Sequence, residues 1–203
     1  MVKDSLNVLT VVGSATPPGR LRRAVSEAGA RATQRDGVEV RLVDLADVRV
    51  AAADGRPADQ LGDDTAAVLA AVERADAVVL ATPVYRGSFT GVLKNLLDHV
   101  PVEALEGTPV GIVAMGATAH HFLGVERHLR DVLAFFGALV APVPVYLTSA
   151  DFADGAPVEA AAGDLDTLYA ALAALARATD GLVLGGPRPL PKRPKPASAP
   201  AGG

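Results

Sequence analysis

The chain has 203 residues, half of them hydrophobic, and this length suits one domain with a full apolar core. It has no cysteine, so disulfides and thiolate metal sites are excluded. The formal net charge is −4, and the last 17 residues hold four basic residues and no acid, which leaves −8 on the rest and argues against a nucleic-acid partner.

Short apolar runs alternate with helical patterns along the whole chain. Strands are predicted over residues 6–12, 38–43, 77–81, 110–115 and 139–147, and helices over residues 21–33, 61–72, 89–100, 122–136 and 165–175. Pro142 and Pro144 interrupt the last strand. Asp63 or Asp64 is expected to cap the second helix, and Asp164 the fifth.

Continuous apolar strands that alternate with helices indicate a parallel sheet covered on both faces. The sequence therefore predicts an α/β fold, a flavodoxin-like three-layer sandwich whose five-stranded parallel sheet has the order 2-1-3-4-5. In this order the first and third strands are neighbours, and a ligand crevice opens between the loops that follow them.

The organisation along the chain is one flavodoxin-like domain, residues 1–184, followed by a tail, residues 185–203. Six of the 15 prolines fall in the tail, which is also basic. We expect it to be disordered; a proline-rich ligand for a partner is the alternative. No apolar run is long enough to cross a bilayer, and we expect a cytoplasmic protein without membrane contact.

The loop after the first predicted strand has the composition of a phosphate site. Ser14 and Thr16 offer hydroxyl groups, the following helix offers free N–H groups, and Arg20 and Arg22 can neutralise a dianion. The loop lacks both the P-loop lysine and the G-x-G-x-x-G pattern, which disfavours triphosphates and Rossmann-bound dinucleotides. Asp44 is therefore interpreted as a turn or cap residue. The alternative for the loop is an ordinary Pro/Gly turn with solvated arginines.

Two further loops can bind a flat polar ring. The loop after the third strand can offer backbone N–H groups, an aromatic side chain and a guanidinium. Its candidate residues are Pro83, Val84, Tyr85, Arg86, Gly87 and Ser88. After the fourth strand come Gly116, Ala117 and Thr118, where glycine permits close backbone approach; Thr118 is equally a good helix N-cap. Together the three loops indicate a mononucleotide with a flat head group, and FMN fits best.

Residues 81–94, Ala-Thr-Pro-Val-Tyr-Arg-Gly-Ser-Phe-Thr-Gly-Val-Leu-Lys, carry a resemblance to a known family. This stretch is similar to the NAD(P)H-dependent FMN reductases, above all to the branch that supplies reduced flavin to alkanesulfonate-type two-component monooxygenases. Residues 115–121 and 129–133 agree with it, and the resemblance covers about residues 6–147.

The resemblance implies FMN as flavin and NADPH or NADH as reductant. It implies that the three loops hold the phosphate, the ring and the pyrimidine edge. Here Leu21 and Arg22 stand where relatives commonly have serines, so either Arg22 replaces a lost hydroxyl or FMN binds more weakly. It further implies a homodimer or homotetramer through the third and fourth helices, and an FMNH2-dependent monooxygenase as acceptor. In relatives a π-bulge can occur near Arg127 and His128; the sequence leaves this open.

The predicted reaction is hydride transfer from nicotinamide C4 to flavin N5, for which no catalytic side chain is expected. One alternative is an FMN-containing quinone, azo or nitro reductase. A second is a flavodoxin-like electron carrier that does not oxidise NAD(P)H. The four histidines, His99, His120, His121 and His128, have no metal-ligand spacing, so no metal site is predicted.

Overall fold

A computed structural model of the chain describes residues 5–16, 19–182 and 184. The predicted tail, residues 185–203, lies outside the described residues, as do Pro17 and Pro18 of the first loop. Among the described residues, no helix is both long and apolar enough to cross a membrane.

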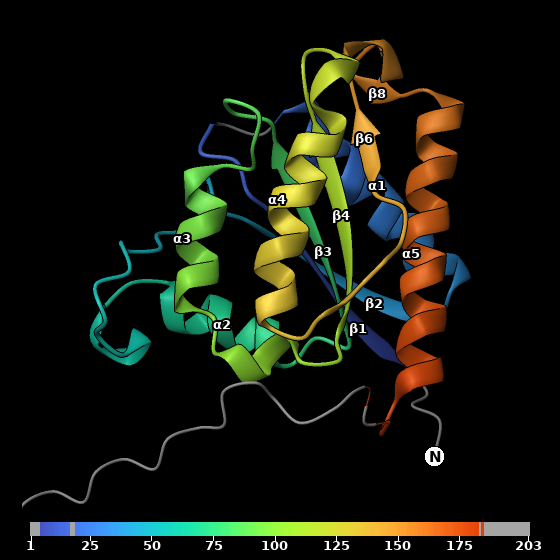
Figure 1. Ribbon diagram of the computed structural model, residues 1–203. Coiled ribbons are helices and arrows are strands. Elements are labelled where there is room, and N and C mark those ends of the chain that lie inside the picture. The colour runs from blue at the N-terminus through green and yellow to red at the C-terminus, as the bar shows by residue number, and fades with distance from the viewer. Residues whose placement is uncertain (1–4, 17–18, 183, 185–203) are drawn as a thin grey trace, which may run out of the picture.

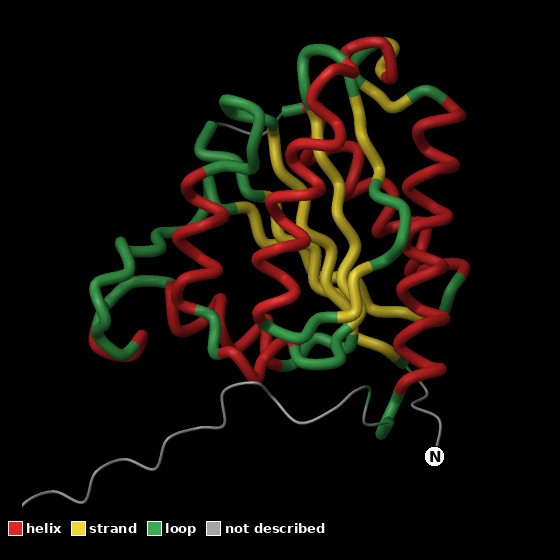
Figure 2. The backbone as a smooth tube through the Cα atoms, in the orientation of Figure 1, coloured by secondary structure: helices red, strands yellow, loops and turns green. Residues whose placement is uncertain are grey.

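A parallel sheet with the order β2-β1-β3-β4-β5 forms the centre of the molecule (Figures 1 and 2). Its strands are β1 (Leu6–Val12), β2 (Val38–Asp44), β3 (Ala77–Pro83), β4 (Pro109–Met115), β5 (Leu139–Val140) and β6 (Val145–Leu147). The last two both pair with β4, so the predicted interruption of one edge strand by prolines is confirmed. Proline lacks the N–H that a ladder needs, which explains the break. The predicted fold and strand order are confirmed.

Helices cover both faces of this sheet. They are α1 (Arg20–Arg35), α2 (Thr65–Glu73), α3 (Gly91–His99), α4 (Phe122–Phe135) and α5 (Glu159–Thr179). One core cluster joins α1 and α5 to the sheet, and a second joins α2, α3 and α4 to the opposite face. In β3 every residue from Ala77 to Thr82 is buried, as expected for a central strand. The predicted three-layer sandwich is therefore present.

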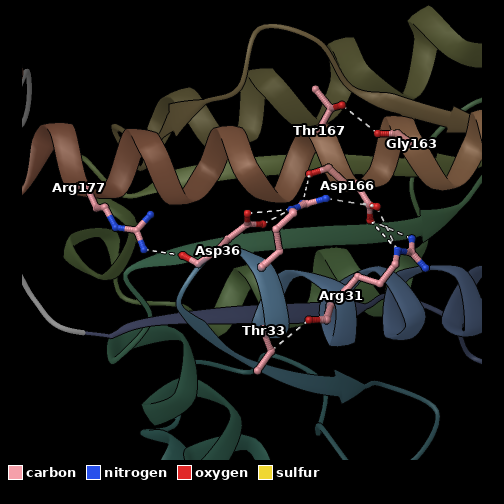
Figure 3. A network of polar contacts seen from close by, with 9 residues as sticks. Arg31, Thr33, Asp36, Gly163, Asp166, Thr167 and Arg177 are labelled. Atoms are coloured by element: carbon pink, nitrogen blue, oxygen red, sulfur yellow. Dashed lines mark hydrogen bonds and ion pairs between the residues drawn. The ribbon is translucent and has the colours of Figure 1, made fainter.

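Polar contacts join the second half of α1 and the residue after it to α5 (Figure 3). Arg31 donates from Nε to Asp166 Oδ1 at 2.9 Å, and Arg35 donates to the carbonyl of Asp166 at 3.0 Å. Arg177 donates to the carbonyl of Asp36 at 2.6 Å, after α1 has ended. These contacts hold the two helices of one layer together.

One predicted helix start is wrong and another is confirmed. Helix α5 begins at Glu159 after Val158, so Asp164 is an interior residue and no cap. Its extra first turn buries Ala161 against the core and follows an unpredicted hairpin, β7 (Phe152–Ala153) with β8 (Ala156–Pro157). Helix α2 begins at Thr65, directly after Asp64, which is one of the two residues expected to precede its first turn.

The acids before α2 serve the long loop that precedes it. Asp64 stands at the N-cap position without a side-chain capping bond. Its carboxylate accepts from the N–H of Arg49, while Asp63 accepts from Thr65 N–H and from Ala51 N–H. Of the two expected caps, Asp63 therefore satisfies a first-turn N–H, and both acids anchor the loop.

Candidate flavin site

The strand carboxyl ends bring the predicted loops to one edge of the sheet. Val12 of β1 pairs in register with Asp44 of β2 and with Ala81 of β3, and Pro83 pairs with Met115 of β4. A hollow of about 140 Å³ opens there, lined by Ser14, Thr16, Arg20, Leu21, Arg22, Asp44, Pro83 and Met115 among others. The topology thus places the loops after β1 and β3 beside each other, as the strand order predicted.

The first loop retains several polar groups that can face a phosphate. Ser14 Oγ and Thr16 Oγ1 lie 3.0 Å apart, and Ser14 Oγ also accepts from Thr16 N–H. Helix α1 starts directly after the loop, with Gly19 as an N-cap that makes no side-chain bond. No described group accepts from the N–H groups of Arg20, Leu21 and Arg22. Such a helix start, with no acid in its first turn, suits an anion.

The two predicted arginines have different surroundings. Arg22 Nη1 lies 2.6 Å from Asp47 Oδ2 and 3.3 Å from Asp44 Oδ2, so its charge is already paired. Arg20 has no carboxylate partner among the described residues; it donates to Ser149 Oγ at 3.2 Å and lies over the Phe152 ring at 5.1 Å. Arg20 is therefore the better candidate for neutralising a phosphate.

Leu21 and Asp44 support the first loop with buried side chains. The Leu21 side chain is buried in the α1 and α5 core, so only its backbone can face a ligand. Asp44 is buried, and its Oδ1 accepts from Ala46 N–H at 3.0 Å, two residues on. The interpretation of Asp44 as a turn residue agrees with this bond, although its ion pair with Arg22 was not predicted.

The loop after β3 forms a tight turn. Tyr85 N–H donates to the carbonyl of Ser88 and Ser88 N–H donates back, while Arg86 and Gly87 between them have φ values of 53° and 78°. Positive φ at both central positions defines a type I′ turn and explains the glycine. Val84 N–H donates to the carbonyl of Met115. Among the described residues, the N–H groups of Arg86 and Gly87 have no acceptor. The sequence predicted N–H donors along the loop, so fewer donors are available than expected.

The third loop is supported by a tyrosine that the sequence analysis missed. Tyr146 on β6 donates its hydroxyl to the carbonyl of Thr118 at 2.8 Å, and burial raises its pKa. A Cβ on Gly116 would lie 2.0 Å from that hydroxyl, so glycine is required here by Tyr146. Gly116 N–H donates to the carbonyl of Leu147, while no described group accepts from the N–H of Ala117 or Thr118. The exposed loop therefore keeps two donors.

His99 and His128 make separate contacts. His128 on α4 places Nδ1 3.0 Å from Ser88 Oγ, against the third-strand loop, whereas His99 contacts the carbonyl of Ala51. Among the described residues, no three His, Asp or Glu side chains gather as a group that could hold a metal. Helix α4 is α-helical over Phe122–Phe135, without a π turn near His128.

The arrangement fits FMN by its chemistry. Hydroxyls and a helix start stand at one end of the edge, where a phosphate would bind, and unpaired N–H groups of the two other loops stand where carbonyl oxygens of a ring would accept. The hollow of about 140 Å³ is smaller than the ~300–1,000 Å³ of most ligand sites, so it suits the phosphate end and leaves the ring near the exposed loops.

Comparison with known proteins shows the family of the chain. The sequence model of the NADPH-dependent FMN reductase family matches residues 6–153, so the chain belongs to that family. The NADH-dependent FMN reductase SfnF of Pseudomonas fluorescens is 35% identical over 73% of this chain and 80% of its own length. The FMN reductase (NADPH) of Pseudomonas aeruginosa is 34% identical over 71% and 78%.

Other relatives match over shorter stretches. An NAD(P)H-dependent FAD/FMN reductase of Geobacillus thermodenitrificans is 42% identical, but the match spans only 54% of this chain and 59% of that protein. An FMN-dependent NADPH-azoreductase of Staphylococcus aureus is 33% identical over 39% and 42%. Among solved structures, the apo form of the NADH:FMN oxidoreductase EMOB has a TM-score of 0.70 at 23% identity, covering 83% and 89% of the two chains. That last likeness supports the fold.

Proposed function

We propose that this member of the FMN reductase family uses NADH or NADPH to reduce FMN and passes the reduced flavin to a partner monooxygenase. The observation that carries the proposal is the meeting of three loops at one sheet edge, each with backbone N–H groups that no described residue accepts from. The names of the relatives support the reduction of FMN, and they include both NADH- and NADPH-dependent enzymes.

When bound, FMN supplies the chemistry, which is acceptance of a hydride at N5. The protein contributes binding and orientation. Ser14, Thr16 and the first turn of α1 would hold the phosphate, together with Arg20, which has no carboxylate partner among the described residues. The N–H groups of Ala117 and Thr118 would donate to the pyrimidine edge of the ring and favour negative charge there.

The third-strand loop supplies the other side of the site. The N–H groups of Arg86 and Gly87 are available to ring oxygens. The Tyr85 side chain is 47% exposed at the edge and can cover part of a flat ring. Arg20 and Arg86 can also contact the phosphates of NADH or NADPH. No side chain is required as an acid or base for the hydride step.

An anaerobic reduction tests the proposal. Purified protein is mixed with FMN and either nicotinamide under nitrogen, and the yellow flavin absorbance is followed. Bleaching that scales with added free FMN, with sequential steady-state kinetics, supports a reductase that releases its product. Failure with both nicotinamides refutes it. Transfer to a monooxygenase is tested by adding an FMNH2-dependent enzyme and following oxidation of its substrate.

The partial match to an azoreductase supports a second candidate, a reductase that retains FMN and reduces quinone, azo or nitro compounds. Ping-pong kinetics, with a quinone as better acceptor and FMN retained through gel filtration, favour this candidate. If the protein is instead a flavodoxin-like electron carrier, it should oxidise neither NADH nor NADPH. Assembly as a homodimer or homotetramer through α3 and α4 belongs to the same proposal, and light scattering of the purified protein measures it.

A further inference from the structure

Two buried threonines connect the first loop to the third-strand loop. Thr90 Oγ1 donates to the carbonyl of Gly13 at 2.6 Å and accepts from Leu93 N–H, so it also caps α3. Thr90 N–H donates to Thr82 Oγ1, which donates in turn to the carbonyl of Pro83 at 2.9 Å. The exposed fraction of Thr90 is 2%, and Thr82 is fully buried. The path therefore runs from the phosphate loop to the ring loop through protected hydrogen bonds.

The contact with Gly13 has a direct consequence for the phosphate loop. The carbonyl of Gly13 and the N–H of Ser14 belong to one planar trans peptide, in which the two groups point in opposite directions. Because Thr90 holds that carbonyl, it also directs the Ser14 N–H away from Thr90. No described group accepts from this N–H, and Ser14 lines the hollow at the strand ends.

Packing makes this position of the loop well defined. Gly13 N–H donates to the carbonyl of Ala81 at 2.7 Å. A Cβ on Gly13 would lie 2.8 Å from Leu93 Cβ, so the loop is in close contact with the start of α3. Removing the Thr90 hydroxyl would leave the buried carbonyl of Gly13 without its donor, which is unfavourable for a buried polar group. The loop would then relax toward water or another donor.

We propose that Thr90 is a positioning residue that sets the preference of the site for phosphorylated flavin, FMN, over riboflavin. It does so by orienting the Gly13–Ser14 peptide toward the phosphate, without touching the ligand. This inference rests on the proposed function, because it takes the first loop as the phosphate end of an FMN site.

The test compares the dissociation constants of FMN and riboflavin for the full chain and for variants at Thr90. Thr90→Val keeps the shape and removes the hydroxyl. Its FMN constant is expected to rise on the order of tenfold, and its riboflavin constant to change by less than about twofold. Thr90→Ser keeps the donor and should stay close to wild type. Thr90→Ala provides a second hydroxyl deletion if the valine variant does not fold.

Thr10 offers a matched control for a lost buried hydroxyl. Its Oγ1 lies 2.7 Å from the hydroxyl of Tyr169, and both groups lie in the core beneath α1 and α5. Thr10→Val should lower the melting temperature while leaving the ratio of the two constants unchanged.

Equal weakening of FMN and riboflavin in Thr90→Val would overturn the inference, because it would indicate general disorder of the site. An unchanged FMN constant would overturn it too, as would a wild-type protein that does not distinguish the two flavins. Failure of the proposed function has a different signature, namely wild-type protein that oxidises neither nicotinamide whatever its flavin affinity.

Discussion

Gly116→Ala tests the tyrosine-supported loop most directly. The new methyl group would lie 2.0 Å from the Tyr146 hydroxyl oxygen and 3.0 Å from Cζ. Because 2.0 Å is too short for two non-bonded atoms, the Tyr146 ring would have to move. Moving it breaks the 2.8 Å bond to the carbonyl of Thr118, which contributes about 1 kcal/mol, and disturbs packing at a further cost of about 1–3 kcal/mol. We expect a loss of about 2–4 kcal/mol in the free energy of unfolding and weaker FMN binding.

Tyr146→Phe should rescue this variant in part. Removing the hydroxyl takes away the 2.0 Å contact and leaves Cζ, which needs to move only a few tenths of an ångström. The double variant should therefore be more stable than the sum of the two single changes predicts, by about 1–2 kcal/mol of coupling.

The assay is urea unfolding of the wild type, both single variants and the double variant, with FMN titrations on each. Gly163→Ala serves as the glycine control, because a Cβ there meets nothing within 4 Å inside α5 and should stabilise the helix by about 0.5–1 kcal/mol. Wild-type stability of Gly116→Ala, or strict additivity in the double variant, would refute the packing argument.

Three further perturbations address the turn, the ion pair and the core. Gly87→Ala places a side chain at φ 78° and should cost about 1–2 kcal/mol and weaken FMN binding, whereas Gly91→Ala meets no atom within 4 Å and should leave both measurements close to wild type. Arg22→Ala leaves the buried Asp44 carboxylate without its cation and should lower the free energy of unfolding by about 1–3 kcal/mol; an unchanged urea midpoint would contradict the pairing. Burial raises the pKa of Tyr169 from 10.0 to about 12, so the folded state holds this proton more tightly than the unfolded state. Its stabilising effect is therefore complete below pH 10 and is lost at about 1.4 kcal/mol per pH unit up to about pH 12, a dependence that Tyr169→Phe should remove from alkaline unfolding curves.

Much of the fold follows from local patterns. The apolar run of β3 is buried on both faces, and the prolines after Val140 separate β5 from β6, as their chemistry requires. Local signals also had limits. The start of α5 was placed at Asp164, because the alanine-rich turn before it lacks large apolar residues, yet Ala161 is buried in the core. Small residues can fill close contacts that a search for large apolar side chains does not register.

The candidate site also follows only in part from local sequence patterns. Loop composition indicated the phosphate and ring positions. Thr90 was missed, because the helix is predicted from residue 89, although threonine is a residue type that commonly caps helices. Nothing in the sequence indicated that its hydroxyl also reaches Gly13, or that Tyr146 supports Thr118. Those bonds join residues 77 and 28 positions apart in the chain.

The sequence by itself determined the order of strands and helices, the three loops and the kinds of polar group that each loop contains. Periodicity and composition are local properties, so they can be read along one chain. Only the tertiary structure decided which of those groups remain available. Arg22 is paired with Asp44 and Asp47, the Leu21 side chain belongs to the core, and Tyr85 bonds to Ser88 within its own turn. Each of these outcomes depends on how the backbone brings partners together, because a donor or a charge is free for a ligand only when no folded neighbour has already engaged it.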